Sequence, residues 1–189
     1  EEELARVEQF QELPASVLQR LGEDEGRNDR IVRCVRAEGD RAVLLFAATV
    51  EHARVLAARL AVQGVSAACI DGGTPPAVHR DFIRRFRARE LRVLVNCAVL
   101  TTGFDDPGVE TVLVARPTFS PVLYRQMIGR GLRGPKSDGT ERCRIVTMLA
   151  DKAFRKDFPV LGEEDKAKKV PRGFDAKHPQ AELLKMRHF

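Results

Sequence analysis

The chain has 189 residues, of which 43% are hydrophobic and 31% charged, and its formal net charge is +5. This length and composition predict one globular domain with a sizeable core, and they exclude a collagen-like repeat, a disulfide scaffold and a wholly disordered chain. No apolar run reaches the roughly 20 residues that span a bilayer, and the acidic start at residues 1–3 does not resemble a signal peptide. We therefore expect a cytoplasmic protein without a membrane partner. Because residue 1 is Glu rather than Met, we expect a processed, trimmed or excised piece.

Charge is distributed unevenly along the chain. Residues 41–133 contain 13 arginines, no lysine and 7 acidic residues, a net charge of +6, whereas residues 1–40 carry −5 and residues 134–189 carry +4. The planar guanidinium suits phosphate, which favours a nucleic-acid partner, although a solvated basic face would have the same composition. The four cysteines, which have neither CxxC spacing nor nearby histidines, are expected to be buried, reduced thiols rather than ligands of a metal.

The order of apolar segments predicts an α/β fold. Residues 1–40 are expected to be helical, with Ile31, Val32 and Val35 on a short amphipathic helix. From residue 42 onward short apolar runs alternate with longer helical patterns, which is typical of a parallel sheet with helices on both faces. Strands are predicted at 42–48, 65–70, 91–97, 110–115 and 143–149.

Helices are predicted between these strands. The first, at 50–63, follows a capping Thr49 and ends at Gly64. Its apolar side is expected to carry Val55, Leu56, Leu60 and Val62. A second helix opens at Pro75 and Pro76, and its apolar stripe is expected to be Val78, Phe82, Ile83 and Phe86. A third is predicted at 120–132, and a last one at 181–187 follows a charged, loosely structured stretch.

The strongest chemical signal is the segment YRQMIGRGLR at 124–133. On a helix started by Ser120, Gln126 and Arg130 lie one turn apart on one face, and Arg133 follows near the end. Two guanidiniums delivered from a helix end suit the charge of a transferring phosphoryl group. Ordinary surface arginines on a helix are the alternative.

A second segment, 96–107, directly follows a predicted parallel strand. Loops at the carboxyl ends of such strands bind phosphates and sugars, so Thr101 and Thr102 could donate to phosphate and Asp105 could accept from a ribose hydroxyl. An ordinary turn would also use Gly and Asp here.

Together the two segments resemble the second RecA-like domain of superfamily 2 helicases and translocases, over residues 42–149. The family's motif six, Q-x-x-G-R-x-x-R, stands at 126–133, and the end of its motif five, G-x-D-x-P, at 103–107. Motif four, a buried strand ending in a hydroxyl, resembles 45–49, and the segment containing Arg80 is similar to the motif that follows it.

The resemblance implies the carboxyl-terminal motor domain of an ATP-dependent DNA helicase or translocase, with a RecA-like parallel sheet. The residues implied in ATP use are the catalytic Arg130 and Arg133 and the nucleotide-binding Gln126, Gly103 and Asp105. The residues implied in binding the nucleic-acid strand are Thr49, Arg80, Thr101 and Thr102. The family's phosphate loop and acidic magnesium motif have no counterpart here, so ATP and Mg²⁺ are expected to be held mainly by an amino-terminal RecA-like domain of the same polypeptide. The isolated chain is expected to be inactive.

We divide the chain into a helical segment (1–40), the helicase carboxyl-terminal RecA-like domain (41–150) and a charged extension (151–189). The wording VLTTGFDDP, with Gln126 and Met127 in place of the His and Arg of DEAD-box RNA helicases, resembles the branch of RadD, XPB and type III restriction subunits, which acts on DNA in repair or restriction. The alternatives are an RNA helicase domain, a non-catalytic nucleic-acid-binding module, and a doubly wound nucleotide-binding enzyme that uses the Gly72-Gly73 turn but lacks a G-x-G-x-x-G motif.

Overall fold

The computed structural model describes residues 13–97, 108–118, 120–129, 143–148 and 182–184. Six strands form one parallel sheet in the order β2-β3-β1-β4-β5-β6. The strands are β1 (Val43–Phe46), β2 (Ala67–Ile70), β3 (Val93–Asn96), β4 (Thr111–Val114), β5 (Arg144–Thr147) and β6 (Glu182–Leu184). The helices are α2 (Ala15–Glu23), α3 (Glu25–Ala37), α4 (Val50–Val62), α5 (Pro76–Arg87) and α6 (Pro121–Ile128). The predicted α/β fold is therefore confirmed.

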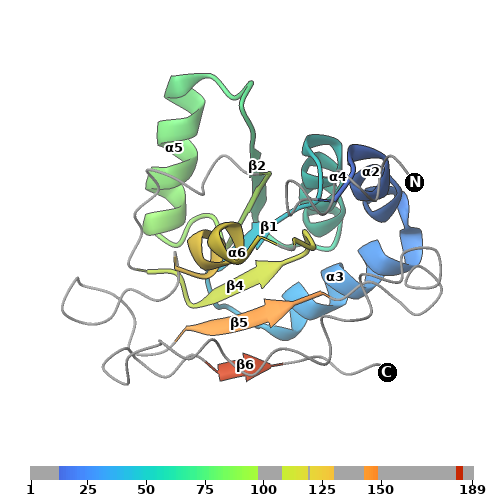
Figure 1. The fold of residues 1–189 in the computed structure, drawn as a ribbon. Coiled ribbons are helices and arrows are strands. Elements are labelled where there is room, and N and C mark those ends of the chain that lie inside the picture. The colour runs from blue at the N-terminus through green and yellow to red at the C-terminus, as the bar shows by residue number, and fades with distance from the viewer. Residues whose placement is uncertain (1–12, 98–107, 119, 130–142, 149–181, 185–189) are drawn as a thin grey trace.

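Helices cover both faces of the sheet (Figure 1). Helices α3 and α4 pack on one face, where Ile31 and Leu56 join Leu45 in one buried cluster. Helices α5 and α6 pack on the other, where Phe86 contributes to a cluster that includes Leu44. Neighbouring residues of β1 thus enter opposite clusters, because successive side chains of a strand point to opposite faces. A strand buried on both faces must be apolar throughout, which explains the continuous apolar run that predicted it.

The predicted caps are present at three helix ends. The Thr49 hydroxyl accepts a hydrogen bond in the first turn of α4, and the Ser120 hydroxyl accepts one from the Leu123 N–H (3.3 Å) in the first turn of α6. Gly64 ends α4 with a φ of +76°, a conformation that side chains other than glycine rarely adopt. The Val65 N–H then donates to the Leu60 carbonyl at 3.0 Å, which gives a partner to one of the carbonyls at the end of the helix.

Two helix faces differ from the prediction. In α4, Leu56 is buried as expected, but Val55 is 40% exposed and Val62 is 84% exposed. The stripe that meets the sheet follows helical spacing from the small Ala53 through Leu56 to Leu60, so the two valines fall outside it. In α5, Val78 is also exposed, since the first turn of this helix projects beyond the sheet (Figure 1).

The last predicted helix is wrong. Residues Glu182–Leu184 form strand β6, which pairs in parallel with β5 so that Leu183 lies beside Ile145. The edge of β5 presents unpaired backbone groups that an added strand satisfies, and a segment this short has no periodicity that distinguishes helix from strand. Helix α6 is described as far as Ile128, with Gly129 as its cap, and the rest of the expected 120–132 helix lies outside the described residues.

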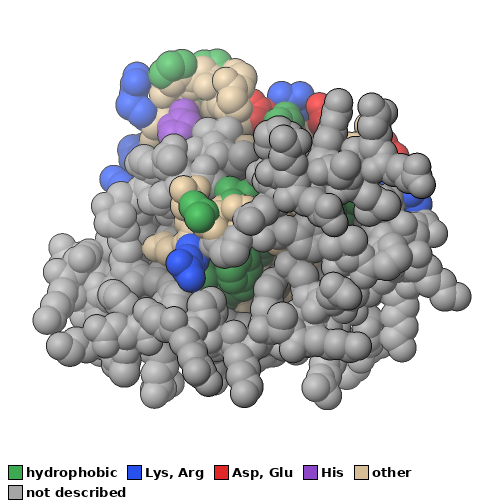
Figure 2. Space-filling model, viewed as in Figure 1, with side chains coloured by type: hydrophobic (Ala, Val, Ile, Leu, Met, Phe, Trp, Pro, Cys, Tyr) green, Lys and Arg blue, Asp and Glu red, His purple; other side chains and the backbone are tan. Residues whose placement is uncertain are grey.

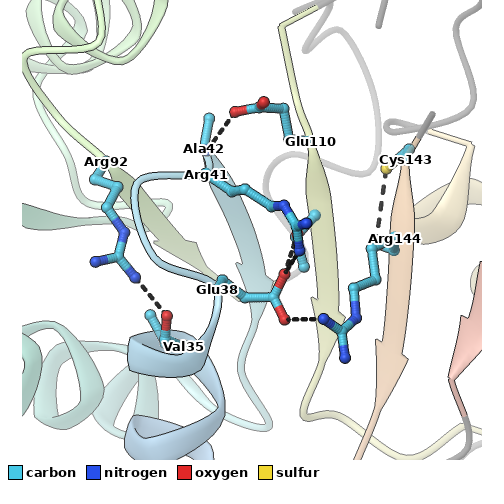
Figure 3. A network of polar contacts seen from close by, with 9 residues as sticks. Val35, Glu38, Arg41, Ala42, Arg92, Glu110, Cys143 and Arg144 are labelled. Carbon is cyan, nitrogen blue, oxygen red and sulfur yellow. Dashed lines mark hydrogen bonds and ion pairs between the residues drawn. The ribbon is translucent and has the colours of Figure 1, made fainter. Parts of the chain in front are cut away.

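A buried carboxylate joins the amino-terminal ends of two strands to the end of α3 (Figure 3). Glu38, with a side chain 3% exposed, accepts from the Thr111 hydroxyl at 2.7 Å and from Arg41 at 3.2 Å. Its other oxygen lies 3.1 Å from a guanidinium nitrogen of Arg144. Because Thr111 begins β4 and Arg144 begins β5, this network fixes α3 against both strands.

Replacing Glu38 with Gln should destabilise the fold by about 2–4 kcal/mol, because the buried charge that compensates two guanidiniums is lost. Urea unfolding followed by circular dichroism measures the change. The matched control is Asp40→Asn, at an exposed neighbour, which should shift stability by less than about 0.5 kcal/mol. Equal effects of the two substitutions would show that the network contributes little.

Candidate functional site

The carboxyl ends of β1 and β4 form the point at which the chain changes direction across the sheet. After β1 the chain passes through α4 to β2 on one side, and after β4 it passes through α6 to β5 on the other. Ligands of open α/β sheets bind in the crevice at such a point. The predicted motif four ends directly after β1, and motif six begins in the last turn of α6, so both motifs follow these neighbouring strands along the chain.

Three of the nine predicted site residues are described by the structure. Thr49 follows β1, Gln126 lies with an exposed side chain in the last turn of α6, and Arg80 is exposed on α5. The remaining six, which lie outside the described residues, are Thr101, Thr102, Gly103, Asp105, Arg130 and Arg133. Thr49 and Gln126 therefore follow adjacent strands, whereas Arg80 belongs to the helix that follows the edge strand β2.

Thr49 has a hydroxyl with unused hydrogen-bonding capacity. Its oxygen accepts a hydrogen bond from the His52 N–H at 3.1 Å, and the residue is half-buried. That contact uses a lone pair, so the hydroxyl proton can still be donated. The start of α4 adds the positive end of a helix dipole, which favours an anion such as phosphate. Glu51 in the same turn carries the opposite charge but is exposed.

A buried polar network beneath Thr49 was not predicted from the sequence. His52 is 2% exposed, and its Nδ1 accepts from the Ala48 N–H at 3.1 Å. Because Nδ1 accepts, Nε2 carries the proton and donates to Asn28 Oδ1 at 2.8 Å. Asn28 Nδ2 in turn donates to the Gly22 carbonyl at 2.9 Å. His52 lies four residues before Leu56 and eight before Leu60, so its place on the buried stripe of α4 was the available signal.

The environment of His52 keeps its imidazole neutral. Burial, together with the positive charges of Arg27 and Arg59, lowers the pKa of His52 to about 4. At neutral pH the ring therefore remains able to accept from Ala48, since a protonated imidazole has no free lone pair.

Two arginines connect the carboxyl ends of the strands by donating hydrogen bonds to backbone carbonyls. Arg27, 1% exposed, donates through Nη2 to the Ala115 carbonyl at 2.9 Å and to the Met148 carbonyl at 3.0 Å, directly after β4 and β5. Arg116 donates to the Ala48 carbonyl at 3.3 Å. These contacts join the carboxyl ends of β1, β4 and β5 to α3, and no motif of the sequence indicated them.

Arginine side chains gather over α5 (Figure 2), but most of them are paired. Arg84 contacts Asp81 at 2.8 Å and Glu90 at 3.4 Å, and Arg89 contacts Glu110 at 3.1 Å. Arg80 has no ion-pair partner among the described residues. Its charge is therefore the one on this helix best able to meet an external phosphate.

The turn after β2 is closed by its own hydrogen bonds. The Asp71 carboxylate accepts from Arg54 at 2.7 and 3.0 Å and from the Gly73 N–H at 2.8 Å. The Arg54 guanidinium, followed by the Gly73 N–H, holds the pKa of Asp71 below its usual range. Since the Gly73 amide is already used, the turn is poorly suited to bind phosphate, which weighs against a doubly wound enzyme built around it.

The cysteines are free thiols, and two of them, Cys34 and Cys143, are buried. Burial raises the pKa of Cys143 to about 12 and that of Cys69 to about 11, which makes both thiols unreactive. Within the described ranges no group of three or more His, Cys, Asp or Glu residues could hold a metal ion. Within them, too, no helix has the length and apolar character needed to cross a membrane.

The family of the chain follows from a comparison with family models. The model of the helicase conserved C-terminal domain matches residues 26–134, more than half of the chain. The chain therefore belongs to the helicase conserved C-terminal domain family. A second model, of a conserved hypothetical protein family (DUF2461), matches residues 129–189.

Two yeast proteins are similar over part of the chain. IRC3 of Saccharomyces cerevisiae, named as an ATP-dependent helicase, is 32% identical over 109 residues, which cover 58% of this chain and 16% of that protein. Irc3 of Schizosaccharomyces pombe, named as a mitochondrial ATP-dependent helicase, is 38% identical over 110 residues, 58% of this chain and 18% of that protein. The chain thus spans less than a fifth of the length of these relatives.

Solved structures share the fold. The C-terminal domain of the DEAD-box protein Dbp5 is 25% identical with a TM-score of 0.56, over 69% of this chain and 77% of that one. A DEAD-box protein from Methanococcus jannaschii is 22% identical with a TM-score of 0.60, over 75% of this chain and 37% of that one. The architecture is therefore that of RecA-like helicase C-terminal domains, as the sequence predicted.

Stability should depend on pH through His52. Its pKa is about 4 in the folded protein and about 6.5 when unfolded, so the unfolded chain binds the proton more readily. The contribution of neutral His52 to the free energy of unfolding is thus complete above about pH 6.5. It should decrease by about 3 kcal/mol as the pH falls to about 4. Urea titrations across this window measure it. In His52→Gln this slope should disappear, and an unchanged slope would contradict the assignment.

Proposed function

We propose that the chain is the carboxyl-terminal motor domain of an ATP-dependent DNA helicase or translocase, with an amino-terminal RecA-like domain of the same polypeptide as its partner. The observation that carries the proposal is Thr49, whose hydroxyl retains a free proton at the switch point of the sheet. The family match over residues 26–134 supports it, as do the names of the two yeast relatives.

Nucleic acid would be bound through its phosphates. Thr49 offers its hydroxyl proton beside the positive end of α4, and Arg80 offers an exposed charge on α5. Thr101 and Thr102 would donate from the segment that follows β3. Such contacts hold a strand without reading its bases.

The nucleotide would be shared with the amino-terminal domain. Gln126 is exposed in the last turn of α6 and so can meet a nucleotide held on another domain. Arg130 and Arg133 follow this helix in the sequence and would act as arginine fingers, with Gly103 and Asp105 at the ribose. ATP and Mg²⁺ would be held mainly by the partner domain, and ATP supplies the phosphoryl group whose transfer drives the motor.

DNA is proposed over RNA because Gln126 and Met127 stand where DEAD-box RNA helicases have His and Arg. One solved structure of similar fold is Dbp5 bound to RNA, at 23% identity, so RNA is the alternative that the experiment must distinguish. A role in repair or restriction and a cytoplasmic location remain predictions, and the Schizosaccharomyces pombe relative is named as mitochondrial.

The isolated chain should bind single-stranded DNA with a dissociation constant of about 10⁻⁴ to 10⁻⁶ M at physiological salt, and affinity should decrease steeply with added salt. It should not hydrolyse ATP. Fluorescence titrations with DNA and RNA oligonucleotides of the same sequence measure both the affinity and the preference. Tighter binding of RNA would favour an RNA helicase domain, and salt-independent binding near 10⁻⁸ M would favour a specific binding module.

Replacing Arg80 with Ala should weaken DNA binding to a similar degree for different sequences and reduce the slope of log affinity against log salt by about 1. The matched control is Arg84→Ala on the same helix, whose charge is already paired with Asp81 and Glu90. Its slope should remain close to that of the unmodified chain. Equal slopes for both variants would remove Arg80 from the proposed strand contact.

In the longer polypeptide that includes the ATP-binding domain, Arg130→Ala or Arg133→Ala should reduce ATP hydrolysis by about 10³-fold or more if either acts as an arginine finger. Nucleic-acid affinity should stay nearly unchanged. A coupled ATPase assay and a binding titration on the same preparations provide the comparison. Parallel losses of hydrolysis and binding in a cooperatively melting variant would indicate a strand contact instead.

A further inference from the structure

His52 contacts the chain on both sides of the Thr49 hydroxyl. Its Nδ1 accepts from the N–H of Ala48, the residue before Thr49, at 3.1 Å. Its backbone N–H donates to Thr49 Oγ1, also at 3.1 Å. We propose that His52 is a positioning residue that directs the Thr49 hydroxyl toward the phosphates of the bound strand, an inference that rests on the proposed function.

The contact with the His52 N–H fixes the direction of the hydroxyl. Because Thr49 Oγ1 accepts from the first turn of α4, that lone pair faces the helix. The hydroxyl proton must then point to another side of the oxygen, where it can be donated. The imidazole meanwhile accepts from the Ala48 N–H, which holds the backbone directly before Thr49 in place relative to α4.

The orientation of the ring is itself fixed by α3. His52 Nε2 donates to Asn28 Oδ1 at 2.8 Å, and the Asn28 amide is oriented by its own bond to the Gly22 carbonyl at 2.9 Å. Each member of the network therefore has a single arrangement that satisfies its neighbour. Such a network transmits a fixed geometry, since any flip of Asn28 would place two donors against each other.

Helix α2 packs against the network at Gly22. A Cβ added at Gly22 would lie 2.9 Å from His52 Cβ and 3.6 Å from Thr49 Oγ1. Only a residue without a side chain allows α2 to approach His52 this closely, and the approach excludes water from the imidazole. After burial, the positive charges of Arg27 on α3 and Arg59 on α4 also favour the neutral form of the ring.

Two conservative variants separate the two hydrogen bonds of the imidazole. In His52→Asn the side-chain oxygen can take the place of Nδ1 and still accept from Ala48, whereas in His52→Gln the amide takes the place of Nε2 and reaches Asn28 instead. We expect His52→Asn to bind a single-stranded DNA oligonucleotide within about twofold of the unmodified chain. His52→Gln should bind about 10-fold more weakly, as should Thr49→Val, because each loses one charge-assisted contact with phosphate.

The double variant Thr49→Val/His52→Gln distinguishes positioning from a general loss of stability. If His52 acts through Thr49, the double variant should bind no more weakly than Thr49→Val alone, although it melts at a lower temperature. Additive losses of affinity, or unchanged binding by a folded His52→Gln, would overturn the inference. If His52→Gln does not fold, Asn28→Ala replaces it in the same cycle, with an expected loss of about threefold.

The outcomes also separate this inference from the proposed function. If the unmodified chain binds neither DNA nor RNA, the proposed function fails and the positioning role fails with it. If the chain binds and Thr49→Val binds equally well, the proposed function survives through other contacts, but the role of His52 is excluded.

Discussion

The candidate site, at the carboxyl ends of the strands, depends on the hydrogen bonds of the buried Arg27 guanidinium. Removing a charge from water costs several kcal/mol, so it is tolerated only where its protons meet acceptors. Arg27 meets the carbonyls that follow β4 and β5, and it thereby sets the first turn of α3 against the sheet. The next residue, Asn28, can then reach His52, which in turn accepts from the Ala48 N–H after β1. One helical turn thus aligns three strand ends.

The two ends of the parallel strands differ in whether their polar side chains can still bind a ligand after folding. At the amino-terminal end, the Glu38 carboxylate is occupied by Thr111, Arg41 and Arg144, so its groups serve the stability of the fold. At the carboxyl end, Thr49 keeps a proton that no described contact uses. This difference agrees with the general rule that α/β sheets bind ligands beyond the carboxyl ends of their strands.

The sheet could be predicted from the sequence because strands buried on both faces are continuous apolar runs, as in β1. Helix faces were harder, since hydrophobicity alone does not set the angle at which Val55 or Val62 meets the sheet. Strand β6 depends on pairing with an edge far away in the sequence, which no local pattern records. In the candidate site, motif spacing predicted Thr49 and Gln126, which follow the neighbouring strands β1 and β4. Arg27 belongs to no motif, and its partner Met148 lies 121 residues away.

That separation in sequence affects how the domain folds during synthesis. Arg27 lies 88 residues before Ala115 and 121 before Met148, so α3 emerges from the ribosome long before its acceptors exist. Contacts between such distant residues are formed late and slow the folding of a domain. A fragment that stops at residue 134, where the helicase family match ends, would retain every motif but lack β5 and one acceptor of the guanidinium. The folded domain therefore extends beyond the residues that the family model matches.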